Sequence, residues 1–332
     1  MINILFTSAG RRIELVQEFI KAKETKNISG KIICADMNKL APALYFADKA
    51  YTIPAISDPE YIETLQDICK KEKISIIIPT IDTELEILAS NVDKFRSIDT
   101  DVLVSSLDTV KIAQNKMETF KLFKSIGLKT PNSYVIGMKY NGNFPCFIKP
   151  ISGSSSINTF KVKNKKELEF FKYYIGNYII QDLIAGEEYT IDIFCNFEGE
   201  PIYITPRIRV ATRSGEVNKT RIYHDQHLIE QVMQIIKALK PKGPLTIQAI
   251  RNKDDNEYYF IEINARFGGG APLSMKAGAN SAQALYDILE GKKVDFKPNA
   301  AKDGLIFLRF DQSIAIELME GGHYEKYHGS NI

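Results

Sequence analysis

The sequence has 332 residues, of which 44% are hydrophobic and 25% are charged, and its net charge is +2. This length suggests two or three domains with a substantial core. The small net charge gives no reason to expect a nucleic acid or an anionic membrane as a partner. No apolar run approaches the roughly 18 residues of a membrane span, so we expect no membrane partner.

The four cysteines, Cys34, Cys69, Cys146 and Cys195, lie far apart and form no CxxC pair. This spacing predicts reduced thiols rather than disulfides or a zinc site. The first residues, MINILFTSAGRR, place basic residues after a short apolar run, the reverse of a secretory signal. We therefore expect a cytoplasmic protein.

The first hundred residues alternate predicted strands and helices. The β-type runs are INILFT (2–7), KIICAD (31–36), SIIIPT (75–80) and DVLVSS (101–106). Helical spacing of apolar residues marks 11–24, 59–73 and 83–95. This alternation predicts an α/β domain with a doubly wound parallel sheet, and such sheets bind ligands at the carboxyl ends of their strands. The segment TSAGRR has one glycine, so we reject a dinucleotide fingerprint there.

The rest of the chain predicts an α+β region. Two helices are expected at 109–115 and 116–127, and β-hairpins with intervening helices follow from about residue 144. Strands are expected around 146–162 and within 178–211, and helices at 165–176 and 225–240. The runs 243–252 and 257–266 predict a hairpin across the turn KDDN.

The strand YFIEINARFGGG carries polar residues at every second position. Because successive strand side chains alternate between faces, Glu262, Asn264 and Arg266 share one face. Gln248 lies on the neighbouring predicted strand. An oxygen-rich cluster of this kind suits Mg²⁺. The alternative is a polar strand that faces solvent.

The turn after Lys149 is rich in small hydrogen-bond donors, namely Ser152, Gly153, Ser154 and Ser155. Such a loop can cover phosphates with hydroxyls and backbone N–H groups, although the P-loop pattern GxxxxGK[ST] is absent. An ordinary hairpin turn is the alternative.

The segment IIQDLIAGEEYTIDIF places Gln181, Asp182 and Ile184 at the end of an apolar strand, with Glu188 and Asp192 beyond a glycine. Exposed backbone beside apolar side chains can hold an adenine, and a carboxylate can hold ribose hydroxyls. The alternative is a solvated bend between two strands.

Arg207, Arg209, Arg213 and Arg221 cluster around a glycine in TPRIRVATRSGEVNKTR. Arginine binds carboxylates and phosphates through two parallel hydrogen bonds, so this run suggests an anionic substrate. A positively charged edge strand that resists aggregation is the alternative.

The order of these segments resembles the ATP-grasp superfamily over about residues 1–290, and most closely proteins similar to the carbamoyl-phosphate synthase large subunit. The resemblance implies a pre-ATP-grasp domain at 1–107, a small lobe at 108–183 and a large lobe at 184–332. Lys116 and Lys149 are then expected to contact nucleotide phosphates, and the serine-rich loop to close over them. Gln181, where many relatives have Glu, would lie with Asp182 and Ile184 around adenine, and Glu188 would bind ribose.

The resemblance also implies ATP with one or two Mg²⁺ ions, or Mn²⁺ in their place. Glu262 and Asn264 match the metal ligands, with Gln248 beside them, and Arg266 matches the arginine near the transferred phosphate.

The carboxylate substrate is expected to meet Arg207, Arg209 and Arg213, with Arg213 close to the reacting group. Gly268 and Gly269 are expected to keep side chains out of the space where phosphate and carboxylate meet.

We therefore expect an ATP-dependent carboxylate–amine ligase that forms an acylphosphate from small-molecule substrates. Two alternatives are a bicarbonate-dependent, carboxyphosphate-forming enzyme and a non-catalytic nucleotide-binding subunit. A single ATP-grasp unit argues against carbamoyl phosphate synthesis, which uses two such units. The sequence leaves a homodimer open and names no substrate.

Overall fold

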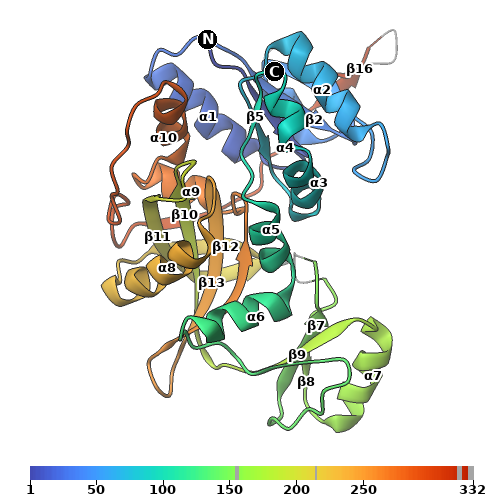
Figure 1. Cartoon of the computed structure of the whole chain (residues 1–332), viewed down its shortest axis with the longest axis vertical. Coiled ribbons are helices and arrows are strands. Elements are labelled where there is room, and N and C mark those ends of the chain that lie inside the picture. The colour runs from blue at the N-terminus through green and yellow to red at the C-terminus, as the bar shows by residue number, and fades with distance from the viewer. Residues whose placement is uncertain (154–156, 214, 320–323, 328–332) are drawn as a thin grey trace. The chain divides into compact units, whose positions relative to one another are not determined.

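The computed structural model describes residues 1–153, 157–213, 215–319 and 324–327, and the chain divides into two compact units (Figure 1). Unit 1 consists of Met1–Val104, Ala282–Lys293 and Arg309–Ile332, and unit 2 of Ser105–Ser281 and Val294–Leu308. The boundaries predicted at 107 and 183 stay a prediction. The two units differ from the predicted domains because two C-terminal segments belong to the same unit as the N-terminal sheet.

Unit 1 is built on a parallel sheet of five strands in the order β3-β2-β1-β4-β5. The strands are β1 (Ile4–Thr7), β2 (Ile32–Asp36), β3 (Lys49–Thr52), β4 (Ile76–Pro79) and β5 (Asp101–Val102). The helices are α1 (Ile13–Thr25), η1 (Pro42–Phe46), α2 (Tyr61–Glu72), η2 (Asp82–Glu84), α3 (Leu85–Ser90) and α4 (Val92–Arg96). The predicted doubly wound parallel sheet is confirmed, and β3 is an additional strand.

The C-terminal segments add α10 (Ser281–Leu289) and a hairpin of β16 (Ile316–Leu318) and β17 (Tyr324–Lys326). The hairpin meets the loop after β2, because Lys39 lies over the ring of Tyr324 and Lys326 over that of Phe46, at 5.1 and 4.6 Å. The sequence carried no motif for this segment, and these contacts explain why it belongs with unit 1.

A buried carboxylate ties the loops after β1 and β4 together. Glu84 accepts hydrogen bonds from the hydroxyls of Ser8 and Tyr61 and from the backbone N–H groups of Thr80 and Ile81. Burial raises the pKa of Glu84 despite these donors. Between β1 and β4 the strand order reverses, so this carboxylate fixes the loops at the switch point of the sheet.

Unit 2 contains two antiparallel sheets. The smaller has the order β6-β9-β7-β8, with β6 (Ser133–Val135), β7 (Cys146–Pro150), β8 (Phe160–Val162) and β9 (Tyr178–Asp182). Ile148 and Ile180 pack in one core with Leu168 of α7 (Lys165–Ile175). One face of this sheet is therefore closed by α7, and the opposite face is left for other contacts.

The larger sheet has the order β14-β13-β10-β11-β12-β15. Its strands are β10 (Gly186–Cys195), β11 (Pro201–Arg213), β12 (Glu216–Ile222), β13 (Pro244–Asn252), β14 (Tyr258–Asn264) and β15 (Ile306–Leu308). The helices of unit 2 outside the small sheet are α5 (Leu107–Gln114), α6 (Lys116–Ser125), α8 (Gln226–Leu239) and α9 (Ala271–Lys276). The predicted hairpin of β13 and β14 is present.

All four cysteines are free thiols, as the sequence predicted, and all four are buried. Burial raises the pKa of Cys195 to about 12, so this thiol stays protonated near neutral pH. Within the described residues, no helix combines the length and the apolar character that crossing a membrane would require.

We predict that Glu84→Ala destabilises unit 1 by about 3 kcal/mol, because it leaves several buried donors without an acceptor. Glu86→Ala, an exposed glutamate two residues away, is the matched control and should change stability by less than about 0.5 kcal/mol. Urea unfolding followed by circular dichroism measures both. Equal losses in the two variants would contradict the role given to Glu84.

Candidate functional site

The large sheet presents one row of polar residues across four strands. Glu262 of β14 lies opposite Gln248 of β13, Gln248 lies opposite Thr190 of β10, and Thr190 lies opposite Arg207 of β11. Residues directly opposite one another in an antiparallel sheet point to the same face. The predicted metal-binding strand and the predicted arginine strand therefore share a face.

A β-bulge at Ile261 aims Glu262 at this row. The register shifts so that Gln248 faces Glu262 while the next residue, Ala249, faces Phe260. Residues two apart in a regular strand share a face, but the bulge places Phe260 and Glu262 on opposite faces. Sequence alternation alone could not reveal this irregularity.

Glu262 is the acceptor at the centre of the polar cluster. Its Oε1 accepts from Gln248 Nε2 at 2.8 Å and from Asn264 Nδ2 at 3.3 Å. Arg266 Nη2 donates to Asn264 Oδ1 at 3.3 Å, so the structure brings these four predicted residues together. In the described chain no three His, Cys, Asp or Glu residues gather as metal ligands, and the set is one carboxylate with two amides. One carboxylate plus phosphate oxygens and water is a usual setting for Mg²⁺, so the donors fit this ion.

The two predicted phosphate lysines also lie at this site. Lys149 is the next-to-last residue of β7 and is only 8% exposed. Burial lowers its pKa to about 8, with the nearby charge of Glu262 opposing the shift and that of Lys116 adding to it. Lys116 begins α6 and donates to the backbone oxygen of Gly153 at 2.9 Å. Ser152 and Gly153 follow β7 in the predicted loop, whereas Ser154 and Ser155 lie outside the described residues.

Gln181 lies on the same face of the small sheet as Lys149. Phe147 is opposite Gln181 and Lys149 is opposite Ile179, while Ile148 and Ile180 point to the α7 side. Gln181 Nε2 donates to Ser133 Oγ at 2.9 Å, and Ser133 donates to the backbone oxygen of Pro131. These bonds commit the amide nitrogen of Gln181 to the protein.

The carboxylate of Asp182 is bonded by residues on either side of β6. It accepts from Asn132 Nδ2 at 2.9 Å and from the hydroxyl of Tyr140 at 3.4 Å. Asp182 and Ile184 line an open cleft together with Asn132 and Tyr259. The side chain of Asp182 is thus occupied, and its backbone N–H donates to the backbone oxygen of Asn132 at 3.1 Å.

Glu188 and Arg209 form an ion pair across β10 and β11, with 3.2 Å between Arg209 Nε and Glu188 Oε2. Arg209 also donates to Thr190 Oγ1 and to the backbone oxygen of Gly215. The Glu188 side chain is 55% exposed, so it stays accessible to a ligand while Arg209 is largely committed.

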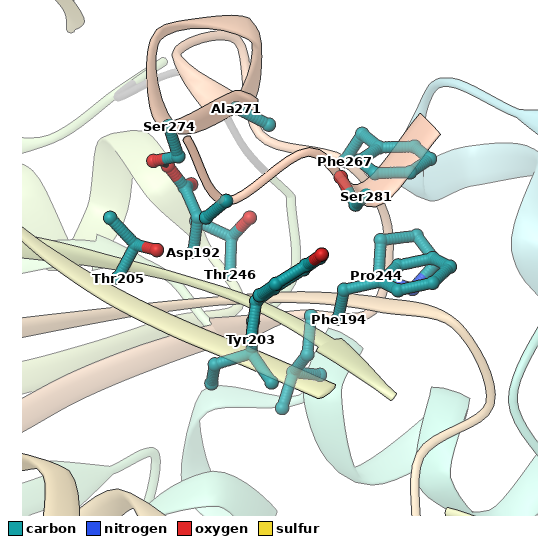
Figure 2. Close-up of a pocket in the computed structure, with 13 residues that line it drawn as sticks. Asp192, Phe194, Tyr203, Thr205, Pro244, Thr246, Phe267, Ala271, Ser274 and Ser281 are labelled. Atoms are coloured by element: carbon teal, nitrogen blue, oxygen red, sulfur yellow. Dashed lines mark hydrogen bonds between the residues drawn. The ribbon is translucent and has the colours of Figure 1, made fainter. Parts of the chain in front are cut away.

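Arg207 differs from the other arginines, because it is only 1% exposed. Its Nε donates to Asp192 Oδ2 at 2.7 Å. The same oxygen accepts from Ser274 Oγ, and Figure 2 shows these two side chains. This burial argues against the predicted contact of Arg207 with substrate. The sequence suggested the carboxylate of Asp192 as a possible ribose ligand. Asp192 lies on the same face of β10 as Glu188 and Thr190, at every second position.

Arg213 is exposed at the far end of β11. It lies six residues beyond Arg207, about 20 Å along a strand, so the structure does not bring it to the row of Glu262. Gly268 is buried and Gly269 half-buried after β14, in the segment that leads into α9. The roles of these three residues stay predictions.

Two family models match the sequence: "PylC-like, N-terminal domain" over residues 4–103 and "ATP-grasp domain" over residues 113–270. The chain is 21% identical over 282 residues to a carbamoyl-phosphate synthase of Methanobrevibacter smithii, covering 78% of this chain and 74% of the relative. It is 28% identical over 168 residues to a D-alanine–D-alanine ligase of Fusobacterium nucleatum, covering 47% of this chain and 58% of the ligase. The match thus spans less than two thirds of the ligase.

Biotin carboxylase of Campylobacter jejuni, solved as an ATP complex, has a similar structure with a TM-score of 0.72. The identity is 17%, and the match covers 92% of this chain and 74% of the carboxylase, which supports the fold. The predicted resemblance is therefore confirmed. The chain carries an ATP-grasp domain over residues 113–270, preceded by a PylC-like N-terminal domain over residues 4–103.

Proposed function

We propose that the protein is an ATP-dependent carboxylate–amine ligase that activates a small carboxylic acid as an acylphosphate. The observation that carries this proposal is the hydrogen-bonded cluster of Glu262, Gln248, Asn264 and Arg266, with buried Lys149 near enough for the charge of Glu262 to act on its pKa. It joins a cation suited to phosphate and a carboxylate suited to a metal in one site, each from a different sheet. Its relatives named as carbamoyl-phosphate synthase and D-alanine–D-alanine ligase support carbon–nitrogen bond formation driven by ATP.

In this proposal ATP is a substrate that the reaction consumes, and Mg²⁺ is the metal ion that binds with it. Glu262, with Asn264 and Gln248, would hold the metal, which supplies charge neutralisation to the phosphates. The amide side chains now donate to Glu262, and each also has a carbonyl oxygen that can serve as a ligand. The number of ions, one or two, stays open.

The first step needs alignment more than proton transfer. A carboxylate is already ionised at neutral pH, so its oxygen can attack the γ-phosphorus while the bond to the β–γ bridging oxygen breaks and ADP leaves. Lys149 and Arg266 would neutralise the charge on the transferred group. This accounts for a site with one carboxylate, two amides and the three cations Lys116, Lys149 and Arg266, and with no acid–base dyad among the described residues.

In the second step an amine nitrogen attacks the acyl carbon, the carbon–oxygen bond to phosphate breaks, and the amine loses a proton to solvent. The product is an amide plus inorganic phosphate. Glu188 would contact the ribose, and the backbone of Asp182 to Ile184 the adenine.

The proposal predicts phosphate release from Mg²⁺-ATP only when both a carboxylic acid and an amine are present. A pooled screen should yield a product whose mass is that of acid plus amine minus water. Hydroxylamine in place of the amine should give a hydroxamate, which reports an acylphosphate. ADP release with bicarbonate alone would favour the carboxyphosphate alternative, and ATP binding without turnover for any acid and amine would favour the non-catalytic nucleotide-binding subunit.

The lowered pKa of Lys149 predicts a pH dependence of nucleotide binding. Its charged form binds phosphate, and in the free protein that form is lost as pH rises through about 8. ATP affinity should therefore be about tenfold weaker at pH 9 than on the low-pH plateau. Equilibrium dialysis with Mg²⁺-ATP measures this. Lys149→Arg keeps its charge and should flatten the profile, while a flat wild-type profile would contradict the role of Lys149.

Glu262→Gln removes the only carboxylate of the metal cluster. We expect Mn²⁺ binding, measured by electron paramagnetic resonance with a non-hydrolysable ATP analogue, to weaken by at least about tenfold. Glu257→Gln, on the same hairpin but outside the cluster, is the matched control and should bind like the wild type. Unchanged binding in Glu262→Gln would rule out this ligand set.

A further inference from the structure

The buried ion pair of Asp192 and Arg207 lies beneath the glycine segment that follows Arg266. Asp192 Oδ2 accepts from Arg207 Nε at 2.7 Å and from Ser274 Oγ at 2.5 Å. Ser274 belongs to α9, so one carboxylate oxygen links β10, β11 and α9. Figure 2 shows the side chains of Ser274 and Asp192 pointing toward each other.

The guanidinium of Arg207 packs directly against Gly270. A Cβ atom added to this glycine would lie 2.7 Å from Arg207 Nη2 and 2.9 Å from Nη1. The φ of Gly270 is −101°, which other residues adopt easily, so space and not backbone conformation requires glycine here. Gly268 is similar, because its Cβ would lie 2.8 Å from Thr246 Oγ1.

This segment continues directly from Arg266. Thr246 Oγ1 donates to the backbone oxygen of Arg266, and Arg266 Nη1 donates to the backbone oxygen of Phe267, both at 3.3 Å. The ring of Phe267 stacks on that of Phe194 at 6.1 Å. The main chain on the C-terminal side of Arg266 is thus fixed from below by β10, β11 and β13.

The cavity beside Asp192 is too small for a substrate. The cavity lined by Asp192, Thr246, Phe267 and Ser274 measures about 10 Å³, which is the room of one water molecule (Figure 2). A carboxylic acid or a phosphate cannot reach Asp192 through it. The pair therefore acts on chemistry only through the residues that it supports.

We propose that Asp192 and Arg207 are positioning residues that fix the segment from Arg266 to Ser274 through Gly270 and α9. The inference rests on the proposed function where it concerns turnover, because Arg266 is the residue being placed. It differs from the sequence-based expectation, in which Arg207 touched substrate.

The test uses Arg207→Lys, Asp192→Asn and Ser274→Ala, each checked for folding by thermal melting. Hydrogen–deuterium exchange without ligand should be at least about tenfold faster in peptides covering 266–276. With substrates identified by the screen, kcat should fall by about tenfold or more, while the KM for ATP changes less than about twofold. If Asp192→Asn fails to fold, Arg207→Lys and Ser274→Ala decide the question.

Ile236→Val is the stability control, because it removes a buried methyl group from α8. It should lower the melting temperature without changing exchange in 266–276 or the kcat. Gly270→Ala provides a rescue experiment, since its methyl group meets the guanidinium of Arg207. Adding Arg207→Lys, which shortens that head group, should raise the kcat above that of Gly270→Ala alone.

Failures of the two proposals are distinguishable. If the wild type binds no ATP, the proposed function fails, and the exchange measurement still decides whether the pair positions 266–276. Unchanged exchange in folded Arg207→Lys overturns the positioning role. It is also overturned if Ile236→Val, at an equal loss of melting temperature, loses as much kcat.

Discussion

A charge that is buried in this protein must meet an opposite charge or several donors, and the candidate site is arranged around that constraint. Asp192 meets Arg207 and Ser274, and Glu84 meets hydroxyl and backbone donors. Lys149 is the exception, because Glu262 only partly offsets its burial and the nearby Lys116 adds repulsion. This surplus of positive charge suits a phosphate, which would satisfy both lysines at once.

Strand alternation places the polar and the apolar side chains of β10 on opposite faces of the large sheet. Thr190 and Asp192 of β10 share the polar face, while Tyr189, Ile191 and Ile193 between and beside them are buried on the other. A slip of one residue would exchange the two faces and bury the whole polar row among apolar side chains. The apolar face therefore fixes the register that brings Gln248 opposite Glu262, so the core of the sheet and its chemistry are specified together.

The fold was largely predictable because apolar runs and turn residues mark most strands. The strand β3 was missed since Lys49–Thr52 has an exposed pattern, and β15 to β17 were missed because tertiary pairing defines them. The polar cluster around Glu262 followed from period-two spacing, but the bulge at Ile261 did not. The burial of Arg207 could not be predicted from the sequence, because its partner Asp192 lies 15 residues away and only the strand pairing brings the two together.

The glycines after Arg266 take on a different meaning once the structure is known. Sequence reasoning predicted that they keep side chains out of the space where substrates meet. In the structure, Gly270 makes room for the guanidinium of Arg207, and Gly268 makes room for Thr246. Both neighbours are parts of the protein below the segment, and both help to hold it. The glycines therefore allow the segment to pack closely against Arg207 and Thr246. Glycine usually makes a chain more flexible, but here it allows the segment beside Arg266 to be held in place.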